Sequence, residues 1–320
     1  MELRKDYILD RWTYISEKRE TRPHDHGKKA EIDNHSKKKC PFCFGKEHLT
    51  PKEIGRVEKL RGKWLVRWIP NKYPSLIKSR KEKTFSSQPF FKSISPFGLQ
   101  EIIIETPGKK QMFELSIKHL SIILKVYNHR IEELSKIEGI EYVLVFKNKG
   151  KEAGASLVHS HSQVMATGKL PAAIEEEVSA FGKYKTCPYC HVIEKEKAGP
   201  RKVFENDSFI AFTPYAPRFN YEIWLFPKEH MRKMKELKES QYFSLAEMLN
   251  KILVKINEIN APYCFYIQYG PEGKDFHWHM EILPRTNIRA GFELSGGDTI
   301  ISVSPERAAR FYRNESDSSN

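Results

Sequence analysis

The sequence has 320 residues, a formal net charge of +13 and an isoelectric point near 9.3. This length allows two domains or one large duplicated domain, and no apolar run approaches the ~20 residues that a transmembrane helix needs. The basic balance favours an anionic partner, such as a nucleic acid, a nucleotide or a phosphorylated sugar. Because the first residues, Met1 to Asp6, form no apolar signal segment, we expect a cytoplasmic protein.

The first half of the chain predicts several strands and one long helix. Residues 23–39 are polar and predict a loop, and the basic, Ser-rich residues 78–96 predict a mobile excursion. Strand patterns occur at residues 7–15, 57–60, 64–68, 101–106, 142–147 and 156–166. One apolar stripe with helical spacing contains Phe113, Ile117, Leu120, Leu124, Tyr127, Ile131 and Leu134.

The second half repeats this order of elements. Each half opens with a Cys-Pro-aromatic-Cys motif and closes with a strand that contains His-x-His. The predicted strands of the second half lie at residues 202–205, 209–213, 221–226, 264–268 and 276–283, and its helical stripe contains Leu245, Leu249, Ile252, Ile256 and Ile259. The repeat predicts a duplicated α+β fold, in which each half is an antiparallel sheet with a helix packed on one face.

The repeat also predicts where the chain divides. We expect residues 1–175 to form the N-terminal half and residues 176–313 to form the C-terminal half. The last residues, 314–320, are polar and acidic and predict a disordered tail.

Three side chains of the first His-x-His segment are spaced to share one face of a strand. His159, His161 and Gln163 lie at i, i+2 and i+4, a spacing that places all three on the same side of an extended chain. The two intervening serines take the other face. The preceding residues, 154–156, are Gly-Ala-Ser, which are small enough for a phosphate to approach the backbone. The alternative interpretation is a polar strand face in contact with solvent.

These motifs resemble the galactose-1-phosphate uridylyltransferase family of the histidine-triad superfamily, from about Trp12 to Arg313. The family's usual His-Pro-His-x-Gln appears here with Ser160 in place of proline, a form similar to the plant ADP-sugar phosphorylase branch. The resemblance implies that His161 is a nucleophile that attacks the α-phosphorus of a nucleotide sugar, and that Gln163 donates its amide N–H to the phosphate oxygens. It implies substrate contacts from Arg19, Arg22, Asn71, Asn148, Gly154, Ser156, Gly291 and Phe292.

The resemblance also implies zinc. The second half offers a closed tetrahedral set made of Cys187, Cys190, His230 and His277. The first half offers Cys40, Cys43 and His159. Relatives with a complete first site usually place a histidine where this chain has Lys109 and Lys110, and a lysine ammonium has no lone pair for a metal. We therefore expect a tightly held zinc in the second half and a weaker or absent one in the first.

We favour an enzyme that moves UMP from UDP-glucose to galactose 1-phosphate through a covalent intermediate on His161. The alternative is a phosphorylase or hydrolase of a nucleotide sugar, such as ADP-glucose, that uses the same intermediate. A third interpretation, a zinc-ribbon protein that binds nucleic acid without catalysis, is disfavoured because aromatic residues do not interleave with the basic runs. The resemblance implies a homodimer, and we expect no membrane association.

Overall fold

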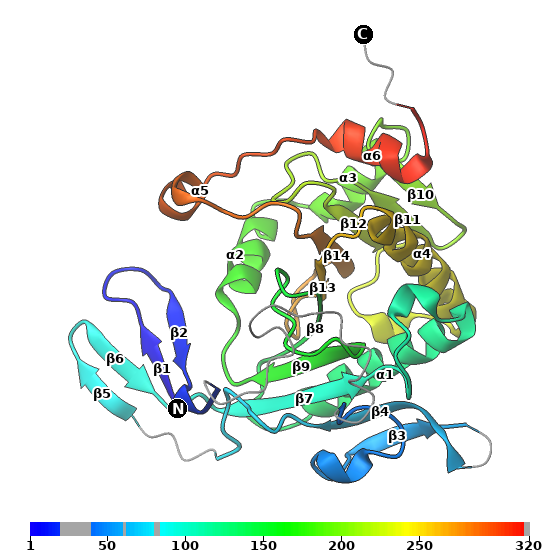
Figure 1. Ribbon diagram of the computed structural model, residues 1–320. Helices are drawn as coiled ribbons and strands as arrows, with labels where there is room; N and C mark the ends of the chain where they lie inside the picture. Colours follow the sequence, from blue (N-terminus) through cyan, green and yellow to red (C-terminus); the bar gives the residue numbers. More distant parts are fainter. Residues whose placement is uncertain (20–39, 60–61, 80–83, 317–320) are drawn as a thin grey trace. The chain divides into compact units, whose positions relative to one another are not determined.

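The computed structural model describes residues 1–19, 40–59, 62–79 and 84–316 (Figure 1). The chain folds into two compact units, each built from several segments. The first unit is made of Met1–Lys110, Val126–Val145 and Ser156–Ser179, and the second of Gln111–Lys125, Phe146–Ala155 and Ala180–Asn320. Two elements, α1 (Ile117–Ser135) and β8 (Tyr142–Lys149), contribute residues to both units.

The main sheet of the first unit positions the predicted nucleophile. Its strand order is β8-β9-β7-β4-β3, with bounds β9 (His161–Thr167), β7 (Gly98–Ile104), β4 (Trp64–Pro70) and β3 (Gly55–Glu58). Strand β7 runs antiparallel to β9, with Ile104 opposite His161 and Ile102 opposite Gln163. The predicted strands at 64–68 and 101–106 are therefore confirmed apart from their ends, whereas the strand predicted at 57–60 lies two residues earlier, at Gly55–Glu58; residue 60 lies outside the described residues.

A second, four-stranded sheet corrects two predictions in the first unit. Residues 7–15 are not one strand, because β1 (Glu2–Lys5) and β2 (Trp12–Ile15) form a hairpin. Its turn is closed by Asp6, whose carboxylate accepts hydrogen bonds from the backbone N–H groups of residues 8 and 9. The predicted excursion at 78–96 contains a second hairpin, β5 (Thr84–Gln88) and β6 (Phe91–Ile94). Pairing of β6 with β1 stabilises this hairpin, an interaction that its local sequence could not reveal.

The second unit contains the repeated sheet and helix. Its strand order is β10-β11-β12-β14-β13-β8, with bounds β10 (Lys202–Glu205), β11 (Phe209–Phe212), β12 (Ile223–Pro227), β14 (His279–Pro284) and β13 (Tyr263–Gln268). The predicted turn between β10 and β11 is closed by Asn206, whose side chain accepts from the N–H groups of Ser208 and Phe209. The predicted apolar stripe is buried in α4 (Glu239–Glu258), apart from its last member, Ile259, which follows the helix and is partly buried. The α+β prediction is confirmed.

In each unit, the Cys-Pro-aromatic-Cys segment covers a small apolar cluster on the sheet. In the first unit Phe42 packs with Trp64, Ile69 and Ile104. In the second, Tyr189 packs against a cluster that contains Ile210, Phe212 and Phe226. The remaining helices are α2 (Ala172–Phe181), α3 (Pro188–Glu196), α5 (Gly291–Gly296) and α6 (Pro305–Arg313). None of the helices formed by the described residues has the length and apolar character to cross a membrane.

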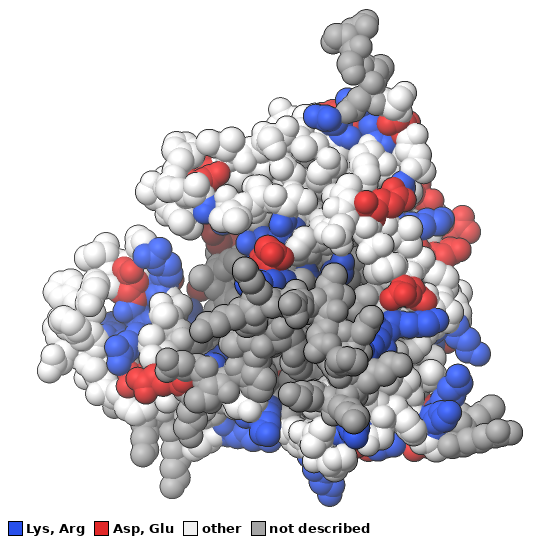
Figure 2. All heavy atoms as spheres, viewed as in Figure 1, with Lys and Arg blue, Asp and Glu red and all other residues white. Residues whose placement is uncertain are grey.

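Basic and acidic side chains are intermixed among the described residues of the face drawn in Figure 2. Elsewhere among the described residues, opposite charges pair within one unit, such as Arg4 with Glu2 at 2.8 Å and Lys228 with Glu205 at 2.9 Å. A surface of mixed sign attracts a continuous phosphate backbone less than a single-sign surface would. The described part of this face therefore does not favour the nucleic-acid interpretation.

Candidate active site and metal centres

His161 is the first residue of β9, so the predicted strand at 156–166 begins later than expected. His159 precedes the strand, and its backbone carbonyl lies 2.7 Å from Nδ1 of His161. A carbonyl oxygen can only accept, so Nδ1 must carry the proton. In the neutral ring the lone pair is then on Nε2, which is the atom that a nucleophilic imidazole needs.

A pocket of about 410 Å³ opens in front of this ring, within the range of small-molecule sites. Most of its wall is apolar, and polar groups of His161, Gln163 and Ser156 lie among these residues. The lining consists of Pro41, Phe42, Leu49, Thr50, Pro51, Ile69, Asn71, Lys72, Tyr73, Ile102, Ser156, Leu157, His161 and Gln163. The ring of Phe42 contacts His161 edge-on, at 5.5 Å between centroids.

Behind the strand, a fully buried carboxylate holds the two serines that flank His161. Glu105 accepts from Ser160 at 2.5 Å, from Ser162 at 2.5 Å and from the hydroxyl group of Tyr127 on α1 at 2.6 Å. The Glu105 N–H also donates to the Ser160 carbonyl at 3.2 Å. These bonds couple the strand carrying His161 to the helix behind the sheet.

The first metal cluster consists of Cys40, Cys43 and His159, whose ligand atoms lie within 4.8 Å of one another. Nε2 of His159 lies 2.8 Å from the Thr106 carbonyl and therefore carries the proton, so Nδ1 offers its lone pair toward the two sulfurs, at 3.3 and 3.7 Å. Burial raises the pKa of Cys40, whereas the neighbouring His159 lowers it by more. The net result is a pKa lowered to about 7. Among the described residues this cluster has three ligands.

The second cluster brings together Cys187, Cys190, His230 and His277, again within 4.8 Å. Both imidazoles are oriented from behind: His230 faces Asp275 at 2.8 Å and His277 faces the Pro227 carbonyl at 3.0 Å through Nε2. Their Nδ1 atoms then face the Cys190 sulfur, at 3.3 and 3.5 Å. Burial, with the neighbouring histidines, lowers the pKa of His277 to about 3. A neutral imidazole with an oriented second nitrogen is what a metal ligand needs.

His159, His161 and Gln163 form a row that contains the predicted nucleophile, here called the nucleophile row. The second half carries a counterpart of this row at His277, His279 and Glu281. As in the first half, Nδ1 of His279 faces the carbonyl of the histidine two residues before, at 3.1 Å. Here, however, Nε2 faces Glu281 at 3.2 Å, and the fully buried ring stacks on Phe226 with 4.4 Å between centroids. The second histidine of this half therefore packs into a core, whereas His161 lines a pocket.

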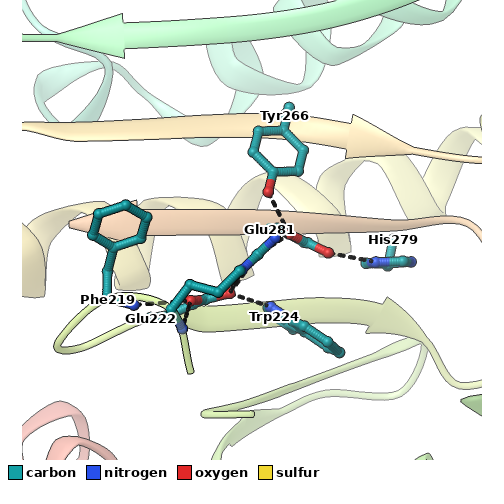
Figure 3. A network of polar contacts seen from close by, with 7 residues as sticks. Phe219, Glu222, Trp224, Tyr266, His279 and Glu281 are labelled. Atoms are coloured by element: carbon teal, nitrogen blue, oxygen red, sulfur yellow. Dashed lines mark hydrogen bonds and ion pairs between the residues drawn. The ribbon is translucent and has the colours of Figure 1, made fainter. Parts of the chain in front are cut away.

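Figure 3 shows how the polar end of this second row is closed. Glu281 accepts from Tyr266 at 2.6 Å and pairs with Arg218, which also binds Glu222 at 2.5 Å. Glu222 in turn accepts from the Trp224 indole at 2.8 Å. Burial raises the pKa of Glu281, whereas His279 and Arg218 lower it by more. The net result is a pKa lowered to about 2. The glutamate in place of glutamine thus serves an internal ion pair.

The other predicted substrate residues are distributed over both units. In the first unit, Arg19 donates to the Tyr73 carbonyl at 3.1 Å, next to the pocket, whereas Arg22 lies outside the described residues. In the second unit, Asn148 lies in β8. Gly154 has a φ of +84°, and a Cβ atom added to it would lie 3.6 Å from the amide nitrogen of Asn148. Gly291 and Phe292 begin α5, where the Phe292 ring is 56% exposed.

The sequence interpretation missed Gln100, which lies in β7 and contacts Gln163, and Glu105, which follows β7 and contacts Ser160 and Ser162 on the opposite face. A signal was present, because both are polar residues at the ends of an apolar strand pattern, Gln100-Glu-Ile-Ile-Ile-Glu105. A polar residue that ends a buried strand requires a partner. The partner could not be named without the register of β7 against β9.

Comparison with known proteins identifies the family. A family model described as galactose-1-phosphate uridyl transferase, N-terminal domain, matches residues 2–171, more than half of the chain. The chain belongs to this family. A second family model, described as scavenger mRNA decapping enzyme C-term binding, matches residues 186–287 of this uridyl transferase family member. The resemblance inferred from the motifs is confirmed, and with it an enzyme of the uridyl transferase type.

Two curated relatives cover nearly the whole uridyl transferase chain. The ADP-glucose phosphorylase of Arabidopsis thaliana is 32% identical, over 98% of this chain and 92% of that protein. The galactose-1-phosphate uridylyltransferase of Thermotoga maritima is 29% identical, over 98% of both. A crystal structure of the Arabidopsis thaliana ADP-glucose phosphorylase with bound ADP-glucose matches with a TM-score of 0.76 and 30% identity, over 99% of this chain and 100% of that one.

Proposed function

We propose that the protein transfers UMP from UDP-glucose to a hexose 1-phosphate, with galactose 1-phosphate as acceptor, through a covalent intermediate on His161. The observation that carries this proposal is the imidazole at the pocket wall, with its proton held on Nδ1 by the His159 carbonyl. Family membership and the Thermotoga maritima uridylyltransferase support the same reaction.

The reaction has two balanced displacements. Nε2 of His161 attacks the α-phosphorus, an N–P bond forms, and glucose 1-phosphate leaves with the electron pair of the broken P–O bond. A phosphate oxygen of the acceptor then attacks the same phosphorus, and the electron pair of the N–P bond returns to Nε2. Gln163 would donate to the phosphate oxygens as their charge changes, and Asn71 and Ser156 would add polar contacts.

A phosphorylase acting on ADP-glucose is the second candidate. It is favoured by Ser160, which replaces the proline of the usual family motif and bonds Glu105, and by the Arabidopsis thaliana relative. In this reaction inorganic phosphate replaces the hexose 1-phosphate in the second displacement, while the first displacement stays the same.

We propose that the Cys/His cluster of the second half holds zinc in a structural role, and that the three-ligand cluster of the first half holds it weakly or not at all. A full set of two thiolates and two oriented imidazoles at Cys187, Cys190, His230 and His277 supports this. The homodimer and the cytoplasmic location stay predictions; sedimentation of the purified protein tests the first of them.

The experiment uses UDP-glucose and ADP-glucose, each labelled in the nucleotide, without an acceptor. Mass spectrometry should find a nucleotide adduct on the peptide that contains His161, and the preferred base separates the two candidates. His161→Asn should abolish the adduct and lower turnover by ~10³-fold or more. The matched control is His48→Asn at an exposed position, and this variant should still form the adduct. Absence of an adduct with both donors, or an adduct elsewhere, would refute the proposal.

A further inference from the structure

We propose that Gln100 is a positioning residue that fixes the amide orientation of Gln163, so that Gln163 presents its NH₂ group to the substrate phosphate. This inference depends on the proposed function and extends it to a residue outside the pocket lining. Gln100 lies in β7, opposite Met165 of β9 and diagonal to Gln163. Diagonal neighbours across antiparallel strands are within reach of long side chains.

A chain of hydrogen bonds determines which end of each amide points where. The backbone N–H of Ser75 donates to Oε1 of Gln100 at 3.0 Å, and the Ser75 hydroxyl donates to the same oxygen at 3.3 Å. A backbone N–H cannot accept, so the oxygen end of Gln100 must face Ser75. Its NH₂ end is then left for Gln163, whose Oε1 lies 3.4 Å away.

The same reasoning orients Gln163. Because its oxygen accepts from Gln100, its own NH₂ group is the end that remains for the pocket, whose wall Gln163 forms. Both side chains are 6% exposed, so little water is available to stabilise the opposite orientation. The backbone carbonyl of Gln100 also accepts a hydrogen bond from the backbone N–H of Asn71, at 2.8 Å. This bond holds a second pocket residue beside Gln100.

The orientation matters because the two ends of an amide have opposite polarity. Phosphate oxygens are acceptors, so an inward NH₂ group stabilises them and an inward carbonyl oxygen repels them. A glutamine free to rotate would have to be ordered during the reaction, whereas one held by Gln100 is ordered beforehand.

Two substitutions of similar length make the proposal testable. Gln100→Glu keeps acceptors for Ser75 but offers Gln163 only an acceptor, so the Gln163 amide should reverse. Gln100→Met removes both contacts and leaves Gln163 free to adopt either orientation. For the nucleotidylation of His161 in a single turnover at saturating donor, we expect a loss of about 100-fold for Gln100→Glu and about 10-fold or less for Gln100→Met.

Each substitution also affects stability, so the loss of rate must be separated from the loss of fold. Gln100→Met leaves the Ser75 N–H without its acceptor, and Gln100→Glu places a carboxyl group at a buried position, so both variants lose stability. The two rates are therefore compared at a temperature at which circular dichroism shows both variants folded. A Gln100→Glu variant that is as fast as Gln100→Met, or faster, would overturn the proposal.

The effect must also pass through Gln163. In a Gln163→Ala background, Gln100→Glu and Gln100→Met should change the rate by less than about twofold, and an undiminished effect would contradict the proposal. If Gln100→Glu does not fold, the Gln100→Met cycle alone decides. In addition, the deficit of Gln100→Glu relative to wild type should grow between about pH 6 and pH 9 as the new carboxyl group ionises.

A readout without catalysis separates this inference from the proposed function. In the free protein, Gln163→Ala should shift the side-chain amide resonances of Gln100, and unchanged resonances would refute the contact whether or not the enzyme forms an adduct. An adduct-free wild type would refute the proposed function instead.

Discussion

Ser160 donates a hydrogen bond to Glu105 at 2.5 Å, on the side of the strand away from the pocket, immediately before His161. Ser162 binds the other carboxylate oxygen at 2.5 Å. The proposed nucleophile, His161, is thus the middle residue of three, and both of its neighbours are held by one buried carboxylate. The His161 ring and its support lie on opposite faces of the same extended segment.

Loss of this carboxylate should destabilise the fold. Glu105→Ala removes the acceptor that the Ser160, Ser162 and Tyr127 hydroxyl groups share, although Ser162 and Tyr127 can still bond each other, and we expect the free energy of unfolding to fall by about 2–4 kcal/mol. Glu105→Gln should cost less, since one amide oxygen still accepts. Urea denaturation measures both. Glu247→Ala, at an exposed position of α4, is the control and should stay within about 0.5 kcal/mol; an equally small change for Glu105→Ala would contradict the support role.

Removal of the Gln163 amide should impair chemistry more than binding. Gln163→Ala takes away a donor whose partner oxygens gain charge in the transition state. One such donor is typically worth a factor of about 10²–10³ in rate. Rapid-mixing kinetics of His161 nucleotidylation would report the rate at saturation and the donor affinity separately. A weakened affinity with an unchanged rate at saturation would make Gln163 a binding residue only.

The two metal clusters should differ in occupancy. The second has four ligands within 4.8 Å, whereas the first has three among the described residues, and structural zinc requires four. Protein purified without added metal should therefore contain nearer one zinc per chain than two. Elemental analysis tests this, and two zinc ions that both resist mild chelation would show that the first cluster has another ligand.

Because metal binding contributes to folding free energy, the matched cysteine variants should separate as well. Cys187→Ser should lower the unfolding midpoint strongly, and Cys40→Ser should lower it less. Equal losses, measured by thermal unfolding at the same zinc concentration, would indicate two equivalent structural sites.

Glu281 should make stability depend on acid pH. Its pKa is lowered from 4.5 to about 2 in the folded protein, so its contribution is present above about pH 4.5 and is lost as the pH falls toward 2. A shift of this size corresponds to about 3 kcal/mol. The difference in unfolding free energy between wild type and Glu281→Gln should therefore shrink over this range. If the difference in unfolding free energy does not depend on pH, the contacts of Glu281 with His279 and Arg218 contribute nothing measurable.

The sequence by itself determined the repeat, the strand and helix order of each half and the chemistry of the short motifs. These features are local: the apolar period of α4, the spacing of Cys187 and Cys190, and the spacing of His159, His161 and Gln163 are each read within one segment. The error at residues 7–15 was a missed local turn, which Asp6 closes, whereas at residues 78–96 pairing with the distant strand β1 decided the structure.

Only the tertiary structure decided which copy of the repeated row lines a pocket. His161 and His279 have the same local geometry, each with Nδ1 toward the carbonyl two residues before. They differ because Phe226 and Glu281, itself paired with Arg218, close around the second ring, whereas the His161 ring lines a pocket, with Glu105 bound to the serines on either side of it. Those contacts join residues far apart in the chain, and strand register and side-chain packing, which arise only on folding, bring them together.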